Sequence, residues 1–354
     1  MNATLIALVC LMCLAMGYRW YGDVIANKVM QLDPSRETPA HENNDGVDYV
    51  PSNKWVLFGH HFASISGLGP ILGPAIAVIW GWLPAVLWVI FGTLFIGAVH
   101  DFTTMAVSVR NDGRSIGDVA SGIINERSRM LFLILIFFLI SLAMGVFAFV
   151  IALLFSKMYP STVIPVFALI VIAMVIGTLV QFEKVTLKWA SVVGIVCLGL
   201  IVWHTLGIEV VRNPDTKVAQ TLVTPTGLGS TLSVPVPGLD SWTYLLMGYA
   251  FVASVLPVWL LLQPRDYLNS FLLYAGLISL FGGLFWMNPS ISAPAVNTGS
   301  SAPTDLPPLF PVLFITIACG AVSGFHSLVS SGTTSKQLDT EADGKMVGFG
   351  GMVA

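Results

Sequence analysis

The sequence predicts an all-α, polytopic membrane protein that crosses the bilayer about nine times, with some of its helices broken. Hydrophobic residues make up 55% of the 354-residue chain and charged residues only 10%, whereas soluble domains carry about 25% charged residues. The apolar residues fall in runs long enough to span a bilayer, which takes about 20 helical residues. Glycines and prolines interrupt two of these runs, a pattern typical of secondary transporters, whose discontinuous helices form the substrate site.

The apolar runs are separated by polar or basic connections that mark the ends of nine predicted spans. The runs are 3–18, 58–79, 83–108, 130–155, 161–181, 187–207, 243–262, 270–287 and 309–330. The first and eighth runs are short for a span. A turn at Trp80-Gly81-Trp82 separates the second span from the third, and its two indole rings suit a membrane interface.

The basic residues are distributed unevenly between the two sides of the membrane that these spans define. Thirteen of the sixteen lysines and arginines lie on one side, and only Lys157, Arg212 and Lys217 lie on the other. Because cytoplasmic loops are enriched in basic residues, the N-terminus is predicted to lie outside. The cytoplasmic connections are then 19–57, 109–129, 182–186, 263–269 and 331–354. The external connections include 208–242 and 288–308.

The two ends of the chain bear on its domain organisation. The first run could be a cleaved signal peptide, but no basic region precedes it, and cleavage would leave the basic connection 19–57 outside. We therefore expect residues 1–354 to form a single transmembrane domain. Residues 344–354 resemble the start of another span, and nine spans is an awkward number for a fold of paired repeats. The sequence thus predicts a fragment of a longer protein whose C-terminal spans are missing.

The second span carries a dense set of helix breakers. They are Gly67, Gly69, Pro70, Gly73 and Pro74. Backbone groups freed by such breaks lack partners in lipid, so the breaks are expected where the backbone lines a cavity. Half-helix ends expose N–H groups that suit a carboxylate. We predict that this segment, with the hydroxyls of Ser64 and Ser66, binds substrate near the bilayer midplane. The alternative is a packed proline kink.

The ninth span contains a second interruption, the small polar run 323–335. Its hydroxyl and carbonyl oxygens suit a substrate or a coupling ion. We assign Ser330, Ser331 and Thr333 of this run to the predicted substrate site. Small residues also let helices approach closely, so tight packing is the alternative interpretation.

Ionisable side chains inside spans are costly and mark functional sites. Five of them fall in the cytoplasmic third of the predicted membrane: His60, His61, His100, Asp101 and His326. At a rise of 1.5 Å per residue, His100 and His326 each lie about 25 Å from the external end of their span. Histidine titrates near physiological pH, so we predict a proton relay or gate. Structural histidines that fix helix ends, or a metal site, are the alternatives, although adjacent His60 and His61 point to different faces of a helix.

Several other functional classes find no support in the sequence. It contains no P-loop, HExxH, GxSxG or EF-hand pattern, so it shows no sign of ATP-driven pumping or of a cofactor. The net charge of −3 gives no indication of a nucleic-acid partner. An intramembrane enzyme would need a nucleophile paired with a base or a firm metal triad, and the spacing offers neither cleanly.

Four stretches resemble the carbon starvation protein A family of bacterial inner-membrane transporters. They are 58–74, 97–102, 263–268 and 323–337, and they follow one another along nearly the whole chain. The resemblance implies proton-coupled uptake of peptides, or of pyruvate in some members, during carbon starvation. It also implies the inverted-repeat fold with broken helices of the amino acid–polyamine–organocation transporters. Family members usually continue with more spans after the motif that ends near Lys336.

We therefore predict a multi-pass symporter of the bacterial inner membrane for a small carboxylate-bearing nutrient, with protons and the lipid bilayer as partners. One alternative is a metal-ion carrier that uses His60, His61, His100 and His326. The other is a membrane nutrient sensor that binds its ligand without moving it. Peptide and pyruvate both carry a carboxylate, so the sequence does not distinguish between them.

Overall fold

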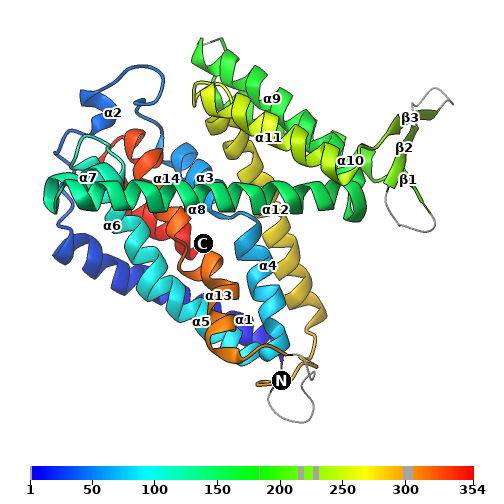
Figure 1. The fold of residues 1–354 in the computed structure, drawn as a ribbon, viewed down its shortest axis with the longest axis horizontal. Helices are drawn as coiled ribbons and strands as arrows, with labels where there is room; N and C mark the ends of the chain where they lie inside the picture. Colours follow the sequence, from blue (N-terminus) through cyan, green and yellow to red (C-terminus); the bar gives the residue numbers. More distant parts are fainter. Residues whose placement is uncertain (1, 183, 214–218, 226–230, 298–305) are drawn as a thin grey trace. The chain divides into compact units, whose positions relative to one another are not determined.

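The computed structural model describes residues 2–182, 184–213, 219–225, 231–297 and 306–354. The chain divides into two compact units. Unit 1 comprises Met1–Met130 and Ser270–Ala354, and unit 2 comprises Leu131–Asn269. Two long helices, α8 (Glu126–Leu153) and α12 (Leu262–Met287), carry the chain from one unit to the other (Figure 1).

Unit 1 is built from helices. They are α1 (Ala3–Met16), α2 (Pro39–Glu42), α3 (Lys54–Ile65), α4 (Leu68–Ala77), α5 (Trp82–Gly92), α6 (Ala98–Val109), α7 (Ile116–Ile123), α13 (Leu309–Ala321), α14 (Gly324–Gly332) and α15 (Gly351–Val353). Wider π-helical turns at Gly17–Tyr21, Val24–Val29, Thr93–Gly97 and Lys345–Gly350 extend several of them.

The described residues of unit 2 include three further helices and a small sheet. The helices are α9 (Val163–Gln181), α10 (Leu187–Thr205) and α11 (Leu239–Val255). After α10, the strands β1 (Glu209–Arg212), β2 (Ala219–Pro225) and β3 (Thr231–Pro235) form an antiparallel sheet in the order β1-β2-β3 (Figure 1). The sequence analysis treated 208–242 as an irregular connection and missed this sheet.

The predicted class, an all-α polytopic membrane protein, is confirmed. Among the described residues, seven helices are long and apolar enough to cross a membrane, or eight if the bent pair Lys54–Ile65 and Gly69–Trp80 counts as one span. The seventh predicted span, 243–262, corresponds to α11, which has 17 residues and ends at Val255. Leu256 is extended there (φ −82°, ψ 147°), because a residue that precedes a proline is sterically disfavoured from helical geometry.

Two predicted boundaries were wrong. The first span does not end at residue 18 but continues to Val29, and an ion pair between Lys345 Nζ and Asp23 Oδ1 (2.6 Å) offsets one charge in this extension. Residues 263–269 are not a connection but belong to the start of α12. There Arg265 Nη2 pairs with Asp266 Oδ1 at 2.6 Å.

The two interruptions predicted from glycine, proline and small polar residues are present in the backbone. Helix α3 ends at Ile65, and Ser66 (ψ 49°) and Gly67 (ψ −163°) leave helical geometry before α4 begins. The two helices meet at a bend of 48°. Helix α13 ends at Ala321, and a non-helical Val322 (φ −143°) leads into α14.

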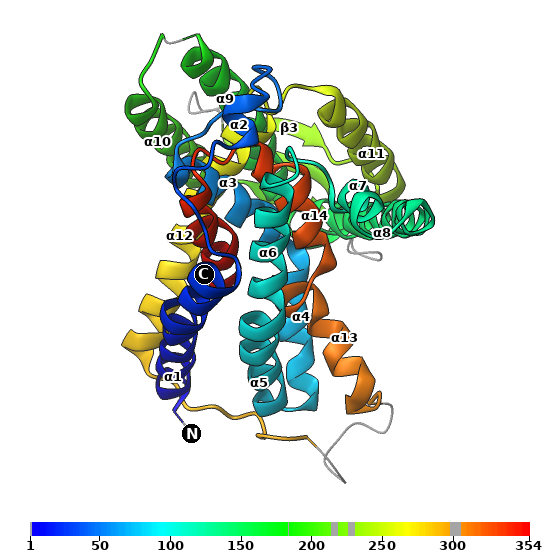
Figure 2. The same ribbon diagram turned by 90° about the vertical axis from the view of Figure 1, so that its left-hand side faces the viewer.

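Helices α4 and α13 pack directly against each other, beside the column formed by α5 and α6 (Figure 2). A Cβ atom on Gly73 would lie 2.5 Å from the carbonyl oxygen of Thr316, and one on Gly320 would lie 3.0 Å from Pro70 Cα. Such close approach requires small residues at the contact. The packing therefore holds the two broken regions next to each other.

A buried cluster ties both ends of the chain to the helices that carry the breaks. It contains Ile25, Ala26, Ile65, Ala98, Phe102, Phe349 and Met352. These side chains come from the extension of α1, from α3 and α6, and from the C-terminal helical turns. The cluster fixes the end of α3 against α6, the helix that carries the predicted relay residues His100 and Asp101.

Candidate substrate cavity and histidine cluster

A cavity of about 240 Å³ lies in unit 1 between the two broken regions. Its wall includes Phe62, Ser66, Pro70, Leu277, His326 and Met352. Most of these side chains are apolar, and Ser66 and His326 contribute polar atoms. An apolar wall with a few polar groups is typical of small-molecule sites. The cavity is thus a candidate for a substrate site.

The structure divides the predicted substrate residues of the second span into two groups. Ser66 and Pro70 line the cavity, whereas Gly69 and Gly73 face α13, where added side-chain atoms would meet Cys319 and Thr316. No described heavy atom lies within 4 Å of a Cβ built on Gly67. Gly69 and Gly73 therefore agree with the alternative interpretation, in which small residues allow close helix packing. The backbone break at Ser66 agrees with the predicted cavity, because Ser66 is part of its wall. The cavity wall does not include Ser64.

The predicted substrate residues of the ninth span lie beyond the cavity, at the end of α14. Ser330 and Ser331 are fully buried. The carbonyl oxygen of Ser331 accepts a hydrogen bond from Ser335 Oγ (2.9 Å) and lies 3.0 Å from Ser108 Oγ of α6. Ser330 Oγ has no hydrogen-bond partner among the described residues. Thr333 ends the helix. None of these three residues is part of the cavity wall, and Ser331 instead contacts α6.

Three of the five predicted relay residues meet directly. His100 Nδ1 lies 3.0 Å from Asp101 Oδ1, and His326 Nδ1 lies 3.8 Å from Asp101 Oδ2. Asp101 and His326 are buried, whereas 27% of the His100 side chain is exposed. A carboxylate between two imidazoles can exchange a proton with either of them. The arrangement leads from an accessible histidine through a buried carboxylate to a histidine at the cavity.

The other two predicted relay residues, His60 and His61, are buried on α3. His61 Nδ1 lies 3.0 Å from Thr334 Oγ1, and its Nε2 is buried with no hydrogen-bond partner in the described part of the chain. A Cβ on Gly351 would lie 2.9 Å from His61 Cδ2, so the ring packs against α15. Helix α15 also contacts His326, because Met352 Sδ lies 3.1 Å from its Nδ1.

Sequence reasoning missed two polar residues that touch this histidine cluster, Ser327 and Thr334. Ser327 Oγ lies 2.6 Å from His100 Nδ1, and Thr334 Oγ1 contacts His61. Both belong to the polar run 323–335, but the sequence analysis chose Ser330, Ser331 and Thr333 from it. Their spacing could have indicated both residues, because Thr334 follows Ser327 by seven residues, about two helical turns, which places them on the same helix face.

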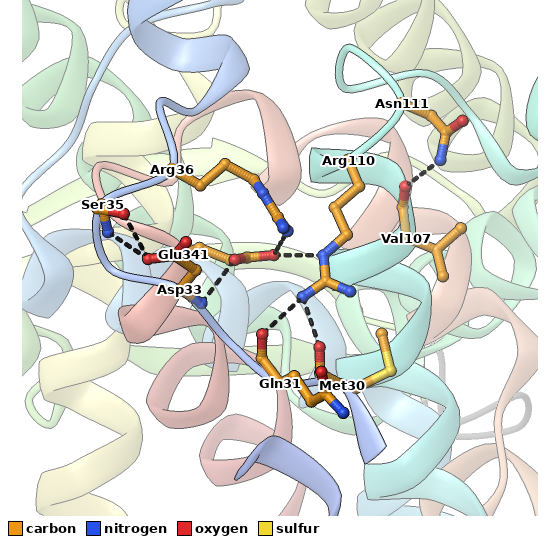
Figure 3. Close-up of polar contacts among 9 residues, drawn as sticks. All are labelled: Met30, Gln31, Asp33, Ser35, Arg36, Val107, Arg110, Asn111 and Glu341. Atoms are coloured by element: carbon orange, nitrogen blue, oxygen red, sulfur yellow. Dashed lines mark hydrogen bonds and ion pairs between the residues drawn. The ribbon is translucent and has the colours of Figure 1, made fainter. Parts of the chain in front are cut away.

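Sequence reasoning also missed a buried ion-pair cluster around Glu341, shown in Figure 3. Its carboxylate accepts hydrogen bonds from Arg36 Nη1 (2.8 Å), Arg110 Nε (2.5 Å) and the backbone N–H of Asp33 (2.9 Å). Arg110 also donates a second hydrogen bond, from Nη2 to the carbonyl oxygen of Met30 (2.5 Å). The cluster joins the N-terminal connection, the end of α6 and the segment after α14.

Next to this cluster, the Asp33 carboxylate closes a local turn. It accepts hydrogen bonds from the hydroxyl (2.6 Å) and the backbone N–H (2.9 Å) of Ser35. These bonds stabilise the charged form, so they hold the pKa of Asp33 below its ordinary value. The carboxylate therefore stays charged at neutral pH and can keep this turn in place.

The described part of the chain contains no candidate metal site. No group of three or more histidine, cysteine, aspartate or glutamate side chains there is arranged to hold a metal ion. The metal-carrier alternative is therefore left without a candidate site among these residues.

Comparison with known proteins identifies the family. Residues 2–354 match the family described as Carbon starvation protein CstA. The chain belongs to this family. It is 38% identical over 99% of its length to the peptide transporter CstA of Campylobacter jejuni and 39% identical over 95% to the pyruvate/proton symporter BtsT of Escherichia coli. It is also 38% identical to the peptide transporter CstA of Bacillus subtilis.

The chain spans about half the length of the curated relatives it matches: 47% of the Campylobacter protein, 45% of BtsT and 56% of the Bacillus protein. No solved structure matches it. Family membership and the apolar helices together make this chain a multi-pass protein of the bacterial inner membrane.

Proposed function

We propose that this chain takes part in proton-coupled uptake of a small carboxylate-bearing nutrient, a peptide or pyruvate, and that it is a transporter rather than an enzyme. The observation that carries the proposal is the position of His326, which lines the cavity and lies 3.8 Å from the buried carboxylate of Asp101. One residue therefore borders both the candidate substrate site and the candidate proton site. The names of the relatives support this class, since they are a peptide transporter and a pyruvate/proton symporter.

The size and chemistry of the cavity favour a small substrate. Its volume of about 240 Å³ is below the roughly 300–1,000 Å³ of pockets for drug-sized ligands. Ser66 and the break beside it supply polar groups for a carboxylate, and Phe62, Leu277 and Met352 supply an apolar wall. A short peptide or pyruvate fits this description better than a long peptide does.

The orientation proposed from the basic residues is consistent with this role. Arg36, Arg110 and Glu341 lie in connections assigned to the cytoplasm. On α3, the predicted relay residues His60 and His61 come before the cavity residue Phe62, toward that side. On α6, Asp101 is nine residues, about 14 Å, before Arg110. Protons that follow a substrate inward would leave on the same side.

Uptake by the purified chain in proteoliposomes tests the proposal. Labelled pyruvate and labelled dialanine are offered with and without an inward proton gradient, and the Escherichia coli pyruvate/proton symporter serves as the positive control. We expect gradient-dependent accumulation of at least one substrate. Leu277→Trp, which fills the cavity, should abolish it, whereas Ile278→Trp should not, because Ile278 is 72% exposed and not part of the wall. No accumulation by the chain, or equal uptake by the two variants, would contradict the proposal.

A further inference from the structure

The Phe62 ring forms part of the cavity wall and is almost fully buried. Phenylalanine is the largest side chain among the described residues of that wall. Phe62 lies four residues before Ser66, and its carbonyl oxygen accepts a hydrogen bond from the Ser66 N–H (2.9 Å). Side chains four residues apart on a helix lie on one face. The ring is therefore the neighbour of the predicted carboxylate site at Ser66.

Other aromatic rings hold Phe62 in this position. Phe58 lies nearly parallel to it, with 5.9 Å between ring centroids and 6° between ring planes, and Tyr274 of α12 lies at 5.4 Å and 16°. Tyr274 in turn meets Phe271 edge-on at 6.3 Å and 89°. Aromatic pairs are favourable at centroid distances of about 4.5–7 Å. The Phe62 ring therefore cannot leave the cavity wall without losing contacts with Phe58 and Tyr274.

The position of Phe62 limits the length of a substrate whose carboxylate binds at Ser66. Four residues of helix rise by about 6 Å. Two residues of an extended peptide span about 7 Å, at 3.3–3.6 Å per residue. Pro70, four residues after Ser66, lines the cavity in the opposite direction along the chain. Between these two rings, the body of pyruvate has room beside Ser66, whereas a dipeptide would meet the Phe62 ring.

We propose that Phe62 sets the substrate class of this chain: its ring restricts the cavity to short monocarboxylates of about the size of pyruvate and excludes dipeptides. The inference rests on the proposed function and decides between the two substrate classes named there. Phe62 is a specificity-determining residue in this account, because its ring forms the part of the wall that a longer substrate would contact.

Ligand binding to the purified chain tests the inference. The dissociation constants of labelled pyruvate, 2-oxohexanoate and dialanine are measured with the wild-type protein. 2-Oxohexanoate differs from pyruvate only in the length of its carbon chain, so it separates the effect of size from that of the ammonium group of a peptide. Extra methylene groups in a packed site weaken binding by roughly 5–150-fold. We expect both longer ligands to bind at least about 5-fold more weakly than pyruvate.

A variant without the ring should lose this preference. In Phe62→Ala, 2-oxohexanoate and dialanine should gain about 5-fold or more in affinity relative to pyruvate. Phe58→Ala is the matched control, because it removes a ring of the same kind that contacts Phe62 but is not part of the cavity wall. Tyr274 still contacts Phe62 in this control, which should keep the wild-type ratio of affinities.

The outcomes separate failure of the inference from failure of the proposed function. Phe62→Leu replaces Phe62→Ala if the latter does not elute as a folded protein, and should shift the affinity ratios in the same direction. Unchanged ratios in the folded Phe62 variant, or an equal shift in Phe58→Ala, would overturn the inference. So would tighter binding of dialanine than of pyruvate by the wild-type chain. If the wild-type chain binds neither pyruvate nor dialanine, the proposed function is refuted and the inference falls with it.

Discussion

Substitution of Glu341 by glutamine tests whether the buried ion-pair cluster holds unit 1 together. The Glu341 side chain is 1% exposed and accepts hydrogen bonds from two arginines and one backbone N–H. Removal of one partner of a buried pair costs about 3–5 kcal/mol. The arginine side chains here are 42% and 28% exposed, so water compensates part of the loss. Glutamine also retains one acceptor oxygen, and we expect a net loss of about 2–4 kcal/mol.

The assay is thermal unfolding of the purified protein in detergent. A loss of this size should lower Tm by roughly 2–8 °C, since 1 kcal/mol shifts Tm by about 2–4 °C for chains of 150–250 residues and by less for a longer one. Glu126→Gln is the matched control, because the Glu126 side chain is 82% exposed and lies 3.9 Å from Arg129; an exposed pair of this kind contributes at most about 1 kcal/mol. If Glu341→Gln and Glu126→Gln melt at the same temperature, the buried cluster does not stabilise the unit.

Two further predictions concern the packing of α4 and the turn beside Glu341. Gly73→Ala should destabilise the chain by about 1–3 kcal/mol, because its Cβ would lie 2.5 Å from the carbonyl oxygen of Thr316, whereas Gly67→Ala has space; equal Tm values for the two variants would disprove the close contact. Ser35→Ala should raise the pKa of Asp33 toward its ordinary value, since the Ser35 hydroxyl lowers it. In the wild-type protein, the stabilising effect of this charge should be present at neutral pH and be lost as the pH falls through the lowered pKa. Titration of the Asp33 carboxyl by NMR checks both statements, and an unchanged pKa in the variant would contradict them.

The backbone of the candidate site was predictable from the sequence because its signals are local. The glycines and prolines of 67–74 cannot continue a regular helix unchanged, and the structure breaks the span at Ser66 and Gly67. The equal depth of His100 and His326 in their spans was predictable, since helical rise fixes depth, and the structure places both histidines next to Asp101. Local composition and periodicity thus located the breaks and brought out the residues that we predict to form a relay.

The contacts that decide between interpretations were not predictable, because they join residues far apart in the sequence. Gly69 and Gly73 have the same residue type as Gly67, but only the position of α13 shows that they serve packing. Glu341 gives no sign in the sequence that its partners are Arg36 and Arg110, which lie more than 200 residues away. The inverted-repeat arrangement of the spans also depends on such distant relations and stays a prediction.

The most direct test of the proposed proton coupling measures substrate exchange and substrate accumulation separately in the Asp101→Asn variant. Asparagine keeps the size of the side chain but cannot carry the proton, so we predict that the variant in proteoliposomes exchanges labelled for unlabelled substrate but does not accumulate it under a proton gradient. Asp112→Asn is the control, because that side chain is 58% exposed and pairs with Arg114 at the surface. Accumulation by Asp101→Asn at the wild-type level would contradict the claim that Asp101 and its histidines carry the coupled proton.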